Sequence, residues 1–170
     1  MIYFTADTHF GHTNIIKYCN RPFSDVEEMD ETIIKTWNRM VGQDDIVYHL
    51  GDFSMGDPRK YYSRLSGKVL IVPGSHDKEL HKLPSYAVLP PLTSVTIEGQ
   101  VIVLCHYAMR SWDRSHYATW HLFGHHHGKL LSYGLSFDVG MDCWEFAPVS
   151  LERVKKKMAG MKPIVDYRSK

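Results

Sequence analysis

Residues 120–128 read Trp-His-Leu-Phe-Gly-His-His-His-Gly, a short and mostly apolar run followed by three histidines between two glycines. The run predicts a buried strand, and the glycines allow a tight turn at its end. Side chains alternate across an extended backbone, so His125 and His127 are expected to point the same way and His126 the opposite way. Six of the eleven histidines fall within residues 106–127. Because imidazole is the commonest metal ligand in proteins, this density indicates a metal site.

Four other strand-like runs end in polar side chains in the same manner. These runs and the polar residues that follow them are 2–6 with Asp7 and His9, 45–50 with Asp52, 69–72 with Ser75, His76 and Asp77, and 101–105 with His106. Open α/β sheets place ligands beyond the carboxyl ends of their strands, so we expect these side chains to converge. Carboxylates and imidazoles without a thiolate suit manganese, iron, zinc or nickel better than calcium or a structural zinc, and their number allows two ions.

The remaining pattern predicts helices around these strands. A capping-box pattern at Ser24 precedes apolar residues at helical spacing, which predicts a helix over 25–40. Pro58 suits the first turn of a short helix, Ser150 can cap a final one, and residues 98–100 predict the turn of a hairpin. The first half mixes strands with helices and the second half is mostly strands, which favours an α/β layered sandwich.

Length and composition narrow the class of protein. The chain has 170 residues, 44% of them hydrophobic and 23% charged, which is typical of a soluble globular domain. We expect one domain over 1–160 and a C-terminal tail over 161–170. The formal charge of +1 lacks the broad excess that sequence-indifferent binding to nucleic acid or membranes requires, although a local basic patch stays possible. The three scattered cysteines, and the lack of a signal peptide or a long apolar run, predict a reduced, cytoplasmic protein with no membrane association.

The five polar blocks resemble a known signature when they are taken in order. Asp7-x-His9, Gly51-Asp52, Gly74-Ser75-His76-Asp77, His106 and Gly124-His125-x-His127 look like the five-block set of the calcineurin-like metallophosphoesterase superfamily. The extended opening, Asp-Thr-His-Phe-Gly-His followed by Asn14-Ile15-Ile16, is similar to that of its small bacterial and phage members.

This resemblance implies a four-layer α-β-β-α sandwich of two packed mixed sheets with a two-metal site between them. It implies that Asp7, His9 and His127 hold one ion, that His106 and His125 hold the other, and that Asp52 bridges both. The cofactors would be two divalent ions, with Mn²⁺ expected first and Fe, Zn or Ni as alternatives. Two cations activate a water as the nucleophile and neutralise phosphoryl charge. His76 would protonate the leaving group as general acid, with Asp77 fixing its tautomer.

The third block departs from the family pattern, which normally reads Gly-Asn-His-Asp and uses the Asn carbonyl as a ligand of the second ion. Here Ser75 stands at that position. A hydroxyl on a shorter side chain is a weaker ligand with less reach, so the second ion is expected to be bound through water, bound weakly or lost.

The expected reaction is hydrolysis of a small phosphodiester, such as a cyclic nucleotide. His12, Arg21 and Arg110 lie near the blocks and are candidates for gripping the phosphate, because an arginine fork matches its oxygens. Two alternatives are a catalytically impaired scaffold that binds other proteins, favoured by Ser75, and a nuclease. The balanced charge argues against an extended nucleic acid as substrate. The sequence leaves the oligomeric state open.

Overall fold

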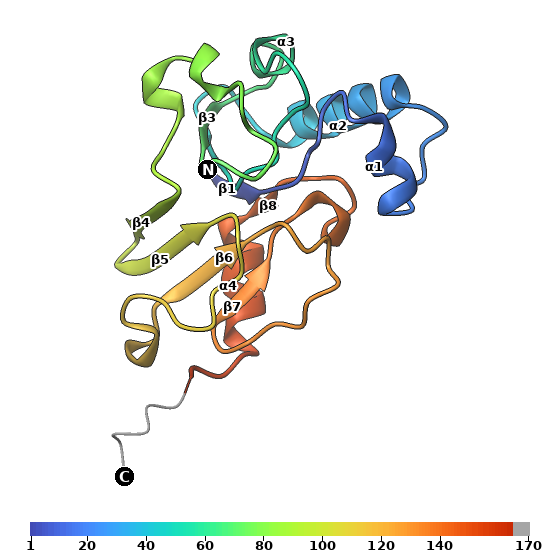
Figure 1. Ribbon diagram of the computed structural model, residues 1–170. Helices are drawn as coiled ribbons and strands as arrows, with labels where there is room; N and C mark the ends of the chain where they lie inside the picture. Colours follow the sequence, from blue (N-terminus) through green and yellow to red (C-terminus); the bar gives the residue numbers. More distant parts are fainter. Residues whose placement is uncertain (165–170) are drawn as a thin grey trace.

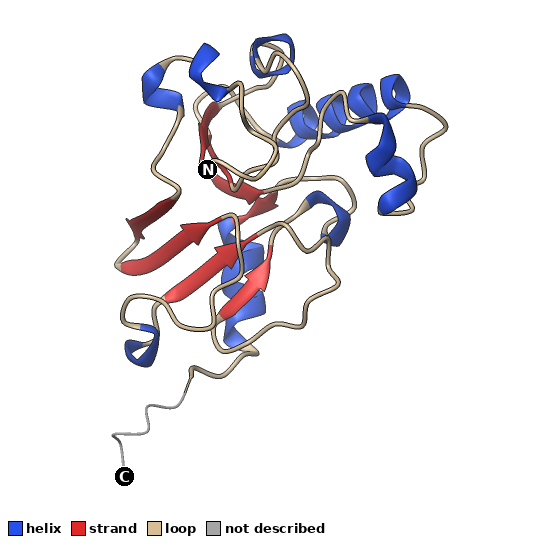
Figure 2. Ribbon diagram, viewed as in Figure 1, coloured by secondary structure: helices blue, strands red, loops and turns tan. Residues whose placement is uncertain are grey.

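The computed structural model describes residues 1–164, which form two four-stranded sheets with helices around them (Figures 1 and 2). The strands are β1 (Ile2–Thr5), β2 (Ile46–His49), β3 (Lys68–Ile71), β4 (Leu92–Ile97), β5 (Gln100–Cys105), β6 (Trp120–Phe123), β7 (Ser136–Asp138) and β8 (Val149–Ser150). The α-helices are α1 (Thr13–Tyr18), α2 (Val26–Met40), α3 (Arg59–Tyr62) and α4 (Leu151–Ala159).

Both sheets are mixed, and each has three parallel strands. The first sheet has the order β3-β2-β1-β8, in which β1, β2 and β3 are parallel and β8 is antiparallel to β1. The second sheet has the order β4-β5-β6-β7, in which β5, β6 and β7 are parallel and β4 is antiparallel to β5. The carboxyl ends of the parallel strands in a sheet therefore lie along one edge, as the predicted convergence of polar residues requires.

Alternation along β1 divides its side chains between two apolar cores. Tyr3 belongs to the core between the first sheet and α2, which also buries Ile33 and Trp37. Phe4 belongs to the core that joins both sheets and α4, together with Phe137 of β7. Figure 1 shows α1, α2 and α3 on the side of the first sheet away from the second, and α4 behind β6 and β7. The α/β sandwich of two mixed sheets flanked by helices is confirmed.

The helix predicted over 25–40 is present, but its cap is shifted by one residue. Asp25, not Ser24, is the N-cap residue, and its carboxylate accepts the backbone N–H of Glu28 at 2.8 Å. Glu28 in turn accepts the backbone N–H of Ser24 at 2.7 Å. Aspartate competes well with serine for this position, so the reciprocal pair forms one residue further on.

The hairpin and the final helix follow the sequence prediction. Glu98 and Gly99 form the two-residue turn between β4 and β5, both at positive φ, as the favoured hairpin turn demands. Ser150 caps α4 by accepting the backbone N–H of Arg153. Of the expected tail, Met161 and Ile164 pack on the second core, and residues 165–170 lie outside the described part of the chain. None of the described helices combines the length and apolar character that a bilayer crossing requires.

Among the α-helices and strands of the described residues, α1 and β8 have no counterpart in the sequence prediction. α1 spans only six residues and has no side-chain cap, and its one buried residue, Ile15, anchors it to the first core. β8 has two residues and forms only because it pairs with β1. Tertiary packing rather than local preference accounts for both.

We predict that Ile33→Ala lowers the free energy of unfolding by about 2–5 kcal/mol, because the fully buried side chain leaves a cavity between α2 and the first sheet. Leu131→Ala is the control, since Leu131 is 88% exposed and its loss should change stability by no more than about 0.5 kcal/mol. Urea unfolding of both variants checks this. Equal losses would contradict the assignment of Ile33 to the core.

Candidate metal centre

The predicted strand ends meet where the two sheets face each other. The backbone N–H of Asp7 donates to the carbonyl of Gly51 at 2.9 Å, and that of His9 donates to the carbonyl of Asp52 at 3.0 Å. These bonds extend the pairing of β1 and β2 past the last residues of the strands. A bridge between Ala6 and Gly140 links the loop after β1 to the loop after β7.

The carboxylate of Asp7 fastens the second sheet to the first. It accepts the backbone N–H of His125 at 3.1 Å and 2.9 Å, one distance to each oxygen. This close approach requires glycine at position 124, because a Cβ there would lie 2.6 Å from the Asp7 carboxylate and 2.5 Å from the Cβ of Ala6. The glycine before His125 therefore serves contact with Asp7 as well as the turn.

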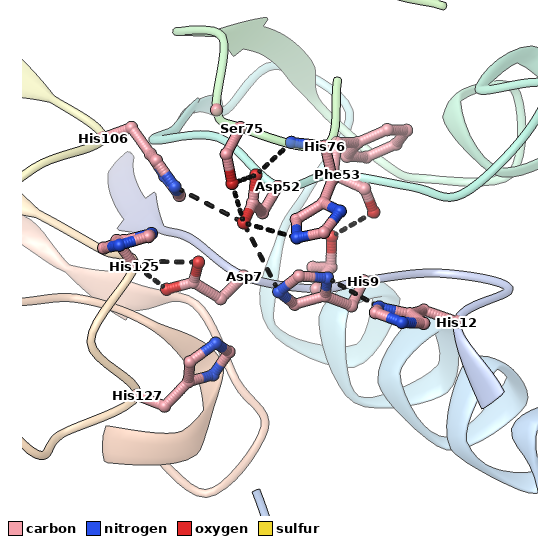
Figure 3. A network of polar contacts seen from close by, with 12 residues as sticks. Asp7, His9, His12, Asp52, Phe53, Ser75, His76, His106, His125 and His127 are labelled. Atoms are coloured by element: carbon pink, nitrogen blue, oxygen red, sulfur yellow. Dashed lines mark hydrogen bonds and ion pairs between the residues drawn. The ribbon is translucent and has the colours of Figure 1, made fainter. Parts of the chain in front are cut away.

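Three groups of three side chains in the described residues have ligand atoms close enough to share an ion, and two of these groups consist of predicted ligands (Figure 3). The third is Cys19, His127 and Asp142. One group of predicted ligands is Asp7, His9 and His127, and the other is Asp52, His106 and His125; within each group, one ligand atom per residue lies within 4.8 Å of the others. The structure thus brings together six of the seven residues named as ligands. The seventh, Ser75, donates its hydroxyl to the Asp52 carboxylate at 3.2 Å and 3.1 Å.

Asp52, which belongs to the second group, also lies close to the first. Its Oδ2 is 3.6 Å from His9 Nε2 and 3.4 Å from His106 Nε2, although these histidines belong to different groups. Its Oδ1 accepts the backbone N–H of His76 at 2.8 Å. A carboxylate with one oxygen between imidazoles of both sets has the placement expected of a bridging ligand.

Five of these residues have a backbone conformation in the left-handed region, which residues other than glycine seldom adopt. Their φ angles are 58° at Asp7, 50° at His9, 55° at Asp52, 70° at His125 and 49° at His127. Such positions cost on the order of 1–3 kcal/mol each and gather at functional sites. This backbone conformation directs each side chain toward the junction of the two sheets (Figure 3).

The orientation of the imidazoles fits a metal ion. His106 Nδ1 donates to the Leu50 carbonyl at 2.8 Å, and His127 Nδ1 bonds to the Asp142 carboxylate at 2.7 Å, so each neutral ring keeps its lone pair on Nε2. The Nε2 atoms of His9 and His106 are buried and lack a hydrogen-bond partner among the described residues. Buried polar atoms are almost always satisfied, so these two nitrogens point to a ligand.

The pKa values of the ligands depend on burial and on their mutual charges. Burial lowers the pKa of His9 to about 2, so its ring is neutral and ready to bind a cation. Burial raises the pKa of Asp7 to about 7, against the opposing effect of His127. For His127, burial alone would lower the pKa, but the hydrogen bond to Asp142 and the charge of Asp7 outweigh it and raise the pKa. A bound cation would replace these protons.

Asp142 is the residue that the sequence analysis missed. Its carboxylate holds His127 and also accepts two N–H groups of Arg21, from Nε at 2.9 Å and from a terminal nitrogen at 2.8 Å. Arg21 donates further to the carbonyls of Asp7 at 2.6 Å and Thr8 at 3.0 Å. The polar turn at Gly140 and Asp142 after β7 repeats the pattern of the other strand ends, and this signal could have identified it.

The structure corrects the role expected of Asp77. Its carboxylate accepts the backbone N–H groups of Asp52, Phe53 and Gly74, each at 2.8 Å. No hydrogen bond joins it to the ring of His76 within the described residues. Asp77 therefore fixes the two loops that carry Asp52 and Ser75, because a buried carboxylate is best satisfied by several backbone donors.

His76 and His12 face the first group of ligands. His76 Nε2 lies 4.0 Å from Asp52 Oδ2 on a side chain that is 43% exposed. His12 Nδ1 is 3.2 Å from His9 Nδ1, and its ring centroid is 5.6 Å from that of His76. Both imidazoles can therefore reach a molecule bound at Asp52.

The two arginines named as phosphate contacts have different surroundings. The side chain of Arg21 is fully buried, and its donors are used by Asp142 and by backbone carbonyls, so it positions the site and does not grip a phosphate. Arg110 lines a separate pocket on the second sheet. His126, expected on the far side, has its ring 6.2 Å from that of Phe123, which also lines that pocket.

Known proteins resemble this chain in sequence and in fold. No family model matches the chain. The uncharacterized protein MJ1445 of Methanocaldococcus jannaschii is 36% identical over 167 residues, which cover 91% of this chain and 89% of that protein. AQ665, a protein of unknown function from Aquifex aeolicus, has a crystal structure that matches with a TM-score of 0.74 and 23% identity, over 92% of this chain and 98% of that one.

A third match comes from a structure described as that of a novel archaeal phosphodiesterase, with a TM-score of 0.52 and 18% identity over 82% of each chain. The chain belongs to the same family as MJ1445, and it shares the fold of the archaeal phosphodiesterase. MJ1445 and AQ665 are both covered over almost their whole length, so this chain and these two proteins are of similar size.

We predict that metal binding at this centre strengthens as the pH rises toward 7. Without metal, folded Asp7 keeps its proton up to pH about 7, whereas the unfolded chain loses it near 3.8, so the metal-free fold loses stability as the pH rises between these values. A cation must displace that proton below pH 7, which weakens binding by about tenfold per pH unit for each proton released. Thermal shift with Mn²⁺ should be larger at pH 8 than at pH 5.5. Equal shifts would contradict this assignment of Asp7.

Asp142→Asn should weaken metal binding by about 10–100-fold, because the amide is a poorer acceptor for His127 Nδ1 than the carboxylate. Asp113→Asn is the control, since Asp113 carries an exposed carboxylate that pairs with Arg114. Calorimetric titration with Mn²⁺ measures both variants. If the Asp142 variant binds like the control, the carboxylate does not orient His127.

Proposed function

We propose that the chain is a metal-dependent phosphodiesterase that hydrolyses a small phosphodiester. The observation that supports it most is the pair of ligand groups that meet at Asp52, with two buried Nε2 atoms that lack a hydrogen-bond partner within the described residues. The archaeal phosphodiesterase shares the fold, which is consistent with the same reaction class.

The residues present suit two divalent ions. Asp7, His9 and His127 would hold one, His106 and His125 the other, and Asp52 both. Divalent ions in such a site supply Lewis acidity, which acidifies water and neutralises the charge that develops on phosphoryl oxygens. Mn²⁺ is the first candidate, with Fe, Zn and Ni as alternatives, because the donors are imidazoles and carboxylates without a thiolate.

His76 and His12 are the side chains placed to act on the leaving group. His76 extends from the loop after β3 with a half-exposed ring near Asp52, and its backbone N–H is tied to that carboxylate. An imidazole at this place can donate a proton from Nε2 to a departing alkoxide or phenoxide. His12 lies beside it and can contact the same end of the substrate.

Ser75, the residue at which the third block departs from the family pattern, affects how the second ion would be held. The Ser75 hydroxyl is directed to Asp52, where it stabilises the bridging carboxylate by hydrogen bonding. In this position it supports the second ion indirectly through Asp52. A pure protein-binding scaffold would have no need of buried imidazole Nε2 atoms without a hydrogen-bond partner in the described residues, so we rank that alternative below the enzyme.

Hydrolysis of bis(p-nitrophenyl) phosphate and of diphenyl phosphate in the presence of Mn²⁺ tests the proposal. EDTA should abolish both activities. His76→Ala should lower the turnover of diphenyl phosphate by about 10²–10⁴-fold, because phenoxide needs a proton as it leaves. The loss should be smaller with p-nitrophenolate, which is a weaker base and departs without help.

His116→Ala is the control, since that exposed histidine lies outside the metal centre and should leave both rates unchanged. The His76 variant should bind Mn²⁺ like the wild type. Activity that resists the chelator would refute the proposal, and equal losses on the two esters would refute His76 as general acid. Fewer than one ion per chain at saturating Mn²⁺ would favour the scaffold.

A further inference from the structure

A mostly apolar pocket of about 380 Å³ lies on the second sheet, within the range of small-molecule sites. Its floor includes Phe123 and Ser136, and its walls come from two loops. Met109 and Arg110 belong to the loop after β5, and Leu130, Leu131 and Tyr133 belong to the loop after β6. Arg110 is the one charged residue among the described residues that line it.

The pocket borders the metal centre. Ala108 lines it and is two residues beyond His106, and Phe123 lines it and is two residues before His125. Successive Cα atoms are about 3.8 Å apart, so each of these wall residues lies within about 7.6 Å of a predicted ligand, measured between Cα atoms. One of these wall residues lies in the loop after β5 and the other at the end of β6, and both are close in the chain to His106 and His125, which places the pocket beside this half of the site.

Tyr107 packs against two of the predicted ligands and directly precedes Ala108 of the pocket wall. Its ring centroid is 4.9 Å from that of His106 and 4.8 Å from that of His125, and both rings meet it edge-on. The side chain is 48% exposed, so one surface of the ring is open to a bound molecule. Ala108 follows directly and begins the pocket wall.

The predicted ligands nearest the pocket lie on the opposite side of Asp52 from the proposed general acid. Figure 3 shows His106 and His125 to one side of Asp52 and His9, His12 and His76 to the other. The ring distances agree, with 5.1 Å between His106 and His125 and 5.3 Å between His9 and His76. A phosphodiester that releases one group beside His76 would hold its other group toward Tyr107 and the pocket.

We propose that this pocket binds an aromatic ester group that stays on the phosphorus during hydrolysis, so that it selects aryl or nucleobase-bearing diesters. The inference rests on the proposed function. Leu130 is 43% exposed and Tyr133 is 52% exposed, so both have surface that a bound ring can cover. In the reaction, the bond from phosphorus to the leaving oxygen breaks, the oxygen of water bonds to phosphorus, and the released alcohol takes a proton.

Two substrates with one leaving group isolate this pocket. Phenyl p-nitrophenyl phosphate and methyl p-nitrophenyl phosphate both release p-nitrophenolate, and they differ only in the group that remains. Wild-type enzyme should favour the phenyl ester in kcat/KM. Leu130→Ser and Tyr133→Ser should each reduce that preference by about fivefold or more, through a higher KM for the phenyl ester.

The matched control is Tyr86→Ser, because Tyr86 is 67% exposed and lies outside the pocket. Comparing the ratio of the two esters between variants cancels the difference in their intrinsic reactivity. An unchanged ratio in both pocket variants, or equal losses on the two esters, would overturn the inference while leaving the hydrolase intact. If neither ester were cleaved by the metal-loaded wild type, the proposed function itself would fail, and the pocket assignment with it.

Discussion

The site depends on the contact between a buried carboxylate of one sheet and a backbone donor of the other. Asp7 lies just beyond the end of the first strand, is fully buried, and accepts the N–H of His125 with both oxygens. Gly124 and Gly140 make room for it, since a Cβ at either position would lie within 2.7 Å of the carboxylate. Without this contact, the predicted ligands from the two sheets would not be held facing one another.

The metal-free arrangement carries several free-energy costs in one place. Five of the predicted ligand residues have a strained backbone, and burial raises the pKa of the Asp7 carboxylate. The buried Nε2 atoms of His9 and His106 lack a hydrogen-bond partner within the described residues. The surrounding structure compensates through Asp77, which satisfies three loop N–H groups, and through Arg21, which joins Asp142 to two carbonyls. A cation would relieve the electrostatic part of these costs, so the fold and the metal centre stabilise each other.

The sequence predicts the strands and the residues at their ends because both follow from local alternation and from where parallel strands finish. It could not assign Arg21 to Asp142, because 121 residues separate the two and a single aspartate after a strand is usually a turn residue. The error on Asp77 has a similar origin. Its neighbour His76 is an obvious partner in the sequence, but the backbone of the loop turns the carboxylate back toward three N–H groups.

Anomalous X-ray scattering from crystals grown with Mn²⁺ tests the central claim most directly. We predict two peaks on either side of Asp52, one beside Asp7, His9 and His127 and the other beside His106 and His125. A single peak at either group would contradict a dinuclear centre. Manganese found only at exposed histidines, with none at Asp52, would contradict the account as a whole.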